Sequence, residues 1–538
     1  MIPEIQHRLR MVAAAFSWAV VVGCQPVEAP EEETEMDDVG DSVIVATSLG
    51  QIRGVREAGV LHFRGVRYAE PPVGERRFLA PLASGPWQGT LEATRFPNRC
   101  TQPDTALPGA PPGTPTSEDC LFLNIVTPAV TGAGRPVLFW IHGGGFVNGS
   151  ANEYNGSMLA GQGDVVVVTI NYRLGLFGFL GLGSLGEQFA GSASNGIRDQ
   201  VLALEWVRDN IADYGGDPRN ITIFGESAGG HSVHALLATP AADGLYHKAI
   251  AHSPGTADQP PTDLLPALLA HLGEGRERVV ETLHAMTADE LFAVQTALPG
   301  VTAGVDGTVV TRATDAAIAE RGARGVPLIA GTNRDEGTFF TALFAAFAPE
   351  GVAAEQMMAA MNPGLAGAVM AGSDPAPYLA ALKARYPDAD AKQIQEHIWG
   401  AMFLKAAMGS AAQATAAGPG GWLYRFDLPT TVDFLGHDVG ATHGAEIPFT
   451  FNRFNSDDPG ALVFHDPEDP VVRDLSQRWS DTIIAFARTG EPNGAGLPYW
   501  PRYDAENRRT LVLDANPRLE ADLNREERKL WESVLGDR

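Results

Sequence analysis

The sequence predicts an α/β fold with a mostly parallel central sheet that is covered by helices on both faces. Unbroken apolar or β-branched runs at Arg135–Ile141, 165–172 and 220–224 are typical of strands buried on both sides. Between the last two runs, residues 196–214 repeat apolar side chains at helical spacing and so form one buried face. Strands that alternate with an amphipathic helix favour the α/β class.

Composition is that of an ordinary globular protein. Of the 538 residues, 44% are hydrophobic and 19% are charged, which excludes a disordered or fibrous chain. Lys and Arg number 39 against 65 Asp and Glu, for a formal net charge of −26. Because so acidic a surface repels phosphate backbones, we expect no nucleic-acid partner.

The N-terminus predicts export. Residues 1–23 contain Arg8 and Arg10 and then an apolar run that is too short to span about 30 Å of hydrocarbon. The run ends in Val21-Val22-Gly23-Cys24, which resembles a bacterial lipoprotein signal. That resemblance implies lipidation of Cys24 and a periplasmic or cell-surface protein with a lipid anchor in the membrane. The alternative is an ordinary cleaved signal and a secreted protein.

An acidic linker is predicted at 24–41, followed by a single domain at 42–538. Residues 25–41 hold eight acidic side chains and few apolar side chains that could be buried. The conformational entropy lost on ordering this segment would therefore exceed the free energy gained by burial. If Cys24 is lipidated, Cys100 and Cys120 remain as an even pair that an exported protein can oxidise. Bridging them contributes on the order of 3 kcal/mol. Two free buried thiols are the alternative.

A candidate nucleophile lies in Gly225-Glu226-Ser227-Ala228-Gly229, a G-x-S-x-G motif. The motif directly follows the predicted strand at 220–224 and precedes a helical stretch at 231–239. A sharp strand-to-helix turn of this kind exposes a serine hydroxyl for attack. The alternative is a glycine-rich turn in which Ser227 only caps the helix.

A glycine loop, His142-Gly143-Gly144-Gly145-Phe146, follows the predicted strand at Arg135–Ile141. It resembles the oxyanion loop of esterases and lipases, in which backbone N–H groups bind the charge on the reacting oxygen. Gly144 and Gly145 are the expected donors, together with the N–H of Ala228 after the nucleophile. A flexible turn is the alternative.

These motifs belong to a longer resemblance that runs almost from end to end. The chain resembles type-B carboxylesterases, the cholinesterase-like branch of the α/β-hydrolases, as a bacterial exported member. The resemblance implies an α/β-hydrolase fold with helical insertions over the active site, here near 340–420. It rests on RGVRYAEPPVGERRF at 64–78, SEDCLFLNIVTP at 117–128, FWIHGGGFVNGS at 139–150, NYRLGLFGFL at 171–180, SNGIRDQVLALEWVRDNIADYGGDPRNITIFGESAGG at 194–230, WSDTIIAFARTGEPN at 479–493 and LPYWPRYD at 497–504.

The same resemblance indicates the acid and the base. In α/β-hydrolases the histidine follows the serine and the acid along the chain. His443 in GATHGAEIPFTF and Glu336 in GTNRDEGTFF match the family's catalytic segments, with His437 as the second candidate base. Asp335 is interpreted as a turn or salt-bridge residue. Glu226 matches a position that lines the family's site, where it either tunes the electrostatics or is a buried structural carboxylate.

Two departures from the family pattern bear on the pocket. The segment 101–119 between the two cysteines contains no aromatic residue, so the cation–π platform of a choline esterase is missing. His252-Ser253-Pro254-Gly255 replaces the family's usual Gln-Ser-Gly.

The sequence therefore predicts a serine carboxylesterase with a Ser-His-Glu triad and an acyl-enzyme intermediate. A small-molecule ester is the expected substrate, and no cofactor or metal is expected. A non-catalytic cholinesterase-like binding module, and an amidase or peptidase that uses the same triad, are the alternatives.

Overall fold

The computed structural model describes most of the folded domain. The described residues are 41–102, 114–132, 134–348, 352–456, 464–494 and 496–535. The predicted export signal at 1–23, the lipidation candidate Cys24 and all of the linker except Asp41 lie outside the described residues, and those predictions stay predictions. In the described part of the chain, no helix is long and apolar enough to cross a membrane.

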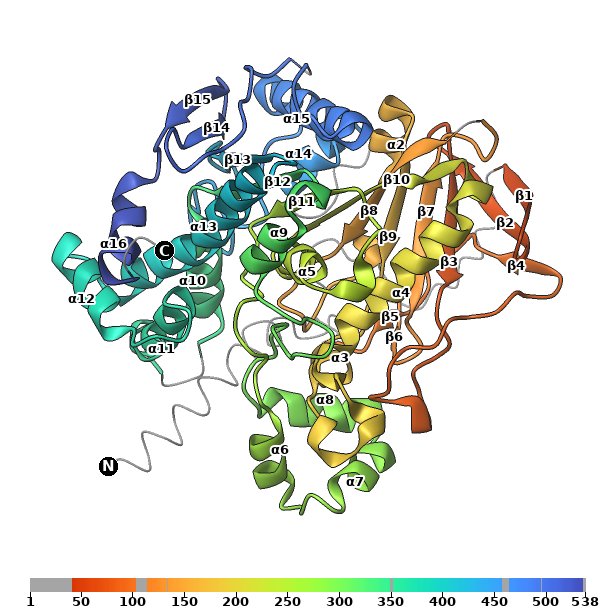
Figure 1. Cartoon of the computed structure of the whole chain (residues 1–538), viewed down its shortest axis with the longest axis horizontal. Coiled ribbons are helices and arrows are strands. Elements are labelled where there is room, and N and C mark those ends of the chain that lie inside the picture. Colours follow the sequence, from red (N-terminus) through yellow and green to blue (C-terminus); the bar gives the residue numbers. More distant parts are fainter. Residues whose placement is uncertain are drawn as a thin grey trace.

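A large mixed sheet runs through the centre of the molecule (Figure 1). Its strand order is β1-β2-β3-β7-β9-β8-β10-β11-β12-β13-β14-β15, with β4 beside β2. The strands from β9 to β14 in this order pair in parallel, and antiparallel strands flank them on both sides. The strands are β1 Ser42–Thr47, β2 Gly50–Glu57, β3 Val60–Arg67, β4 Thr90–Glu92, β7 Phe122–Thr127, β8 Arg135–Ile141, β9 Val166–Ile170, β10 Gly216–Glu226, β11 Lys248–His252, β12 Leu328–Asn333, β13 Gly421–Phe426, β14 Arg509–Leu513 and β15 Arg518–Ala521; β5 Arg99–Cys100 and β6 Thr116–Ser117 pair separately.

Helices cover both faces of this sheet, which confirms the predicted α/β class (Figure 1). They are α2 Ser157–Gly163, α3 Gly175–Phe179, α4 Asn195–Asn210, α5 Ala228–Leu237, α6 Leu265–Leu272, α7 Val279–Ala285, α8 Ala288–Thr296, α9 Thr314–Arg321, α10 Glu336–Ala346, α11 Ala354–Val369, α12 Ala376–Arg385, α13 Ala391–Ala417, α14 Ile447–Thr450, α15 Pro470–Thr489 and α16 Arg525–Leu535. The helix predicted at 196–214 ends earlier as α4, because its last turn tightens into a 3-10 helix, Ile211–Tyr214, before the left-handed Gly215.

Alternate side chains of the central strands build two cores. In β8, Val137 and Phe139 belong to the core beneath α4 and α5, whereas Leu138 and Trp140 belong to the core beneath α15. Successive side chains of a strand point to opposite faces, so an uninterrupted apolar run fills both cores at once. Strand β10 runs parallel to β8 and β11, so its last residues emerge at the same edge of the sheet as theirs.

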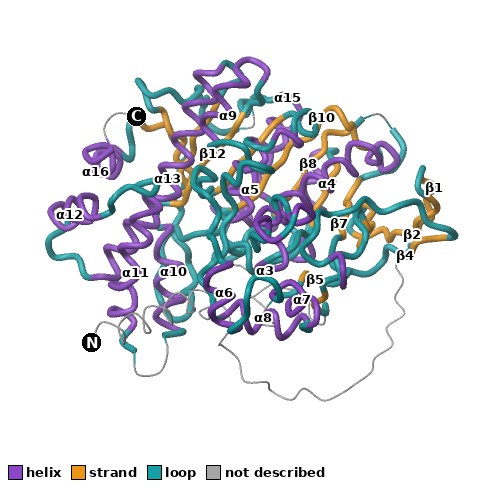
Figure 2. The backbone as a smooth tube through the Cα atoms, turned by 60° about the horizontal axis from the view of Figure 1, so that its bottom comes forward, coloured by secondary structure: helices purple, strands orange, loops and turns teal. Residues whose placement is uncertain are grey.

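The segment near 340–420 is helical, as predicted. It contains most of α10 and all of α11, α12 and α13. Figure 2 shows α10, α11 and α13 side by side at one end of the molecule. Cys100 and Cys120 are joined by a disulfide.

Candidate active site

Ser227 lies at the turn between β10 and α5. The strand ends at Glu226, the helix begins at Ala228, and Ser227 between them has φ 58° and ψ −120°. A Cβ at Gly229 would overlap the carbonyl oxygen of Ile141 in the neighbouring strand. The close approach of helix and sheet thus requires glycine there, and positive φ is a strained conformation for serine that tight packing must hold.

The predicted acid and base are in direct contact. Glu336 is the first residue of α10, just beyond the end of β12, and His443 lies in the loop before α14. Nδ1 of His443 is 2.6 Å from Oε2 of Glu336. Both residues are buried, with 1% of Glu336 and 6% of His443 exposed. A buried carboxylate in this position favours the tautomer of His443 whose proton is on Nδ1.

Two further groups hold the other oxygen of Glu336. Its Oε1 accepts hydrogen bonds from Oγ of Ser253 at 2.6 Å and from the backbone N–H of Asn333 at 2.8 Å. In the sequence, Ser253 stands out only as part of a departure from the family pattern. Ser253 reaches Glu336 because β11 and β12 are adjacent in the sheet, and the local sequence around Ser253 does not predict that adjacency.

Glu226 faces the other side of the imidazole. Its Oε1 is 3.1 Å from Nε2 of His443. Among the described residues Nε2 has no hydrogen-bond partner, so Ser227 and His443 are not hydrogen-bonded to each other in this structure. Burial raises the pKa of Glu226 to about 7. Burial alone would lower the pKa of His443, but Glu226 and then Glu336 outweigh it and raise that pKa to about 9.

The glycine loop follows β8 and lies beside Ser227. Gly144 and Gly145 have φ values of 95° and 62°, which favour glycine. A Cβ at Gly143 would lie 3.1 Å from Cβ of Ser227, so this loop and the nucleophile are in close contact. Ala228 is the first residue of α5, and the first N–H groups of a helix have no acceptor within it. The three predicted oxyanion donors are therefore near neighbours of the nucleophile.

Replacing Gly144 by alanine is expected to lower kcat by about 10²-fold or more, because the loop must move to admit a side chain. The new Cβ would overlap both the side-chain and the backbone oxygen of Asn148, and φ would remain strained. Steady-state kinetics on an ester, with Gly307→Ala as the control, measure the effect. Gly307 also has positive φ, but nothing crowds it. Equal losses in both variants would assign the effect to backbone strain alone.

A cavity of about 470 Å³ opens on these residues. Ser227, His443, Glu226 and the glycine loop lie on its wall. Most of the rest is apolar and comes from the glycine loop, from the segment between α8 and α9, from α10, α11 and α13, and from the region of α14. Its apolar side chains include Phe146, Val301, Phe339, Phe340, Leu343, Phe344, Leu365, Trp399, Met402, Phe403, Ile447 and Phe451. Such a cavity admits a substrate of moderate size with a large apolar part.

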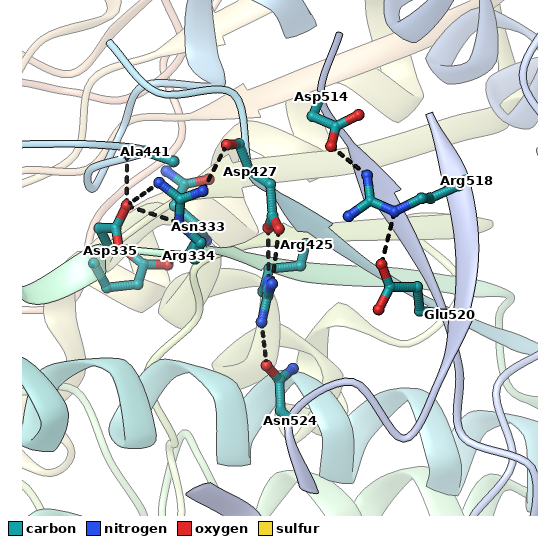
Figure 3. A network of polar contacts seen from close by, with 11 residues as sticks. Asn333, Arg334, Asp335, Arg425, Asp427, Ala441, Asp514, Arg518, Glu520 and Asn524 are labelled. Atoms are coloured by element: carbon teal, nitrogen blue, oxygen red, sulfur yellow. Dashed lines mark hydrogen bonds and ion pairs between the residues drawn. The ribbon is translucent and has the colours of Figure 1, made fainter. Parts of the chain in front are cut away.

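Asp335 has the structural role that the sequence analysis assigned to it. Its Oδ2 is 2.7 Å from Nη2 of Arg334 and accepts the backbone N–H of Ala441 at 2.9 Å (Figure 3). The backbone N–H of Asp335 also donates to the carbonyl of Ala441. Asp335 thus ties the end of β12 to the loop that carries His443, two residues further on.

The other histidines are placed differently. His437 pairs through its backbone with Phe434 and is not one of the described residues that line the cavity. His252 is buried with Nδ1 2.7 Å from the hydroxyl of Tyr424. His231 does line the cavity, one helical turn beyond Ser227, which the sequence analysis did not foresee.

Comparison with known proteins identifies the family of the chain. Residues 41–531 match the model of the carboxylesterase family. The chain is 36% identical to the para-nitrobenzyl esterase of Bacillus subtilis over 503 residues, which cover 90% of this chain and 98% of that protein. It is 35% identical to a cocaine esterase of Oryctolagus cuniculus over 545 residues, which cover 92% of this chain and 97% of that protein.

Solved structures are similar over the same length. A thermophilic para-nitrobenzyl esterase superimposes with a TM-score of 0.79 at 34% identity, and a carboxylesterase of Geobacillus stearothermophilus with a TM-score of 0.76 at 36% identity. Each comparison covers 91% of this chain and 99% of the other. The chain therefore has the α/β-hydrolase fold and is a carboxylic ester hydrolase of the type-B carboxylesterase family.

Proposed function

We propose that the enzyme hydrolyses carboxylic esters through Ser227, His443 and Glu336 and an acyl-enzyme intermediate. The observation that carries the proposal is the convergence of three features on one cavity: a half-buried serine at a strand-to-helix turn, a buried His–Glu pair, and a glycine loop against the serine. These are the three parts that acyl transfer needs, namely a nucleophile, an oriented base and donors for the oxyanion.

In the first step His443 takes the proton of Ser227 while Oγ attacks the ester carbonyl. The negative oxygen of the tetrahedral intermediate binds the N–H groups of Gly144, Gly145 and Ala228. Protonated His443 then gives its proton to the departing alcohol. In the second step His443 takes a proton from water as the water oxygen attacks the acyl-serine. The bond to Oγ of Ser227 then breaks, His443 returns the proton to Oγ, and the acid leaves. The Ser227–His443 hydrogen bond that this requires would form with substrate in place, since such contacts often tighten only in the reacting complex.

The cavity favours esters with a bulky apolar part over small polar ones, because its wall is largely aromatic and aliphatic. The test is turnover of p-nitrophenyl esters from acetyl to decanoyl chains, with the matching p-nitroanilides alongside. We expect hydrolysis of esters with an optimum at short to medium length. Anilide turnover equal to ester turnover would favour an amidase, and no turnover of any substrate would favour a binding module.

Ester hydrolysis is expected to rise with pH through the neutral range. His443 acts as a base only when it is unprotonated, and its raised pKa of about 9 keeps much of it protonated below that pH. kcat/KM should therefore fall as the pH falls, by about tenfold per pH unit well below the pKa. Replacing Glu226 by glutamine removes a negative charge 3.1 Å from Nε2, so this acidic limb should move to lower pH by about 1–3 pH units.

The pH dependence of kcat/KM for the wild type and Glu226→Gln measures this displacement. Glu153→Gln is the matched control: Glu153 also lines the cavity but is not among the groups that raise the pKa of His443. If the acidic limb of kcat/KM in Glu226→Gln stays at its wild-type pH, Glu226 does not raise the pKa of His443.

A further inference from the structure

We propose that Phe403 is a positioning residue for the catalytic imidazole: its ring lies against one face of His443, restrains the tilt of the imidazole and stabilises its protonated form. The inference rests on the proposed function, in which His443 is the base. Phe403 comes from the helical insertion, 67 residues after Glu336 and 40 residues before His443 in the chain.

Aromatic rings pack around His443 in a defined arrangement. The ring centroids of Phe403 and His443 are 4.8 Å apart and the two planes differ by 23°, so they are stacked. Phe340 lies 4.9 Å from the imidazole at a tilt of 44°. Trp399 stacks on Phe340 at 4.1 Å and 16°, and lies 5.8 Å from Phe403. The imidazole thus belongs to an aromatic cluster in which Phe340, Trp399 and Phe403 also contact one another.

The register of α13 against α10 places Phe403 at this position. At Gly337, immediately after the catalytic acid, a Cβ would overlap the backbone of Glu396, so the two helices are in close contact there. Oγ1 of Thr341 donates to Oε1 of Glu396 at 2.7 Å, which joins α10 to α13 at the same height. Phe403 lies seven residues, or about two turns, beyond Glu396 and so projects from the same side of α13. The helix that begins with Glu336 thereby positions the ring that stacks on the histidine.

The chemistry of the imidazole makes such a ring useful. Nδ1 is hydrogen-bonded to Glu336, whereas Glu226 lies 3.1 Å from Nε2 without a hydrogen bond to it. Glu446 also raises the pKa of His443. One hydrogen bond at Nδ1 leaves the ring free to tilt about it, and the stacked face of Phe403 opposes that tilt. During both steps His443 becomes positively charged, and the face of an aromatic ring attracts a cation.

The test compares Phe403→Leu with Phe403→Tyr and Phe344→Leu. Loss of the ring in Phe403→Leu should lower kcat on a p-nitrophenyl ester by on the order of tenfold and move the acidic limb of kcat/KM to lower pH by about half to one pH unit. Phe403→Tyr keeps the stacked face and should restore both quantities. Phe344 lines the same cavity from α10, so Phe344→Leu should alter KM and leave the limb in place. Phe403→Met replaces Phe403→Leu if the latter does not fold.

A second measurement does not depend on turnover. In a Ser227→Ala background, the histidine ring resonances of labelled protein report the titration of His443 directly, with His443→Gln as the assignment. We expect the Phe403→Leu change to lower the titration midpoint and Phe403→Tyr to leave it near that of the background protein. Unchanged titration and unchanged kcat in Phe403→Leu would overturn the proposal. An absence of serine-dependent turnover in the wild type would overturn the proposed function, whatever the titration shows.

Discussion

Turnover of ester substrates is expected to fall by roughly 10⁴- to 10⁶-fold when Ser227 is replaced by alanine. The reason is that Ser227 supplies the atom that forms the acyl-enzyme bond, and no other hydroxyl occupies the turn between β10 and α5. The residual rate reflects binding and the oxyanion donors alone. The measurement is kcat on a p-nitrophenyl ester, with circular dichroism to show that the variant is folded.

Ser232→Ala is the matched control for this loss. Ser232 lies in α5, which follows Ser227; it is fully buried and accepts a hydrogen bond from Gln200. Its replacement therefore perturbs the fold near the site without removing a proposed catalytic group. A serine-reactive phosphonate provides an independent readout, because it should label the wild type and Ser232→Ala on the peptide that contains Ser227. Wild-type turnover in Ser227→Ala would refute the nucleophile assignment.

Replacing Glu336 by glutamine is expected to lower kcat by roughly 10³- to 10⁴-fold. The amide keeps the shape of the side chain but loses the charge that stabilises protonated His443. Its NH₂ group can also face Nδ1 and enforce the wrong tautomer. Because Ser253 and the backbone of Asn333 hold Oε1, the remaining oxygen is the one directed at the histidine. Glu336→Asp should fall between the wild type and glutamine, since it retains charge at a longer distance.

Asp335→Asn tests whether the loss in Glu336→Gln comes from the charge beside the imidazole or from disturbance of the loop. Asp335 is the adjacent carboxylate, but it binds Arg334 and the backbone of Ala441 instead of the imidazole. Its replacement should weaken the connection between the acid and histidine loops and cost thermal stability, while kcat falls far less than in Glu336→Gln. Equal losses of kcat in the two variants would mean that Glu336 acts through loop structure and not through its charge.

Local sequence was sufficient to predict the fold class and the candidate nucleophile. Strand β8 is recognisable because both of its faces are buried, and Ser227 because a G-x-S-x-G motif joins a strand to a helix. These features involve contacts within a few residues, so their periodicity and glycine placement are visible along the chain. Glu336 and His443 required the resemblance to a family, because Glu336 follows Ser227 by 109 residues, His443 follows Glu336 by 107, and neither lies in a pattern that by itself marks it as catalytic.

The environment of the triad was decided only by the tertiary structure. Ser253 meets Glu336 because β11 and β12 are adjacent, Glu226 meets His443 because the loop before α14 crosses the end of β10, and Phe403 stacks on the imidazole because α13 is fixed against α10. Each of these contacts joins residues that are 40 or more positions apart in the chain. Contacts at that separation leave no local sequence pattern that would predict them. Sequence by itself therefore determined which groups we propose for the chemistry, and packing determined the charges and rings that surround them, because those contacts join parts of the chain that are far apart.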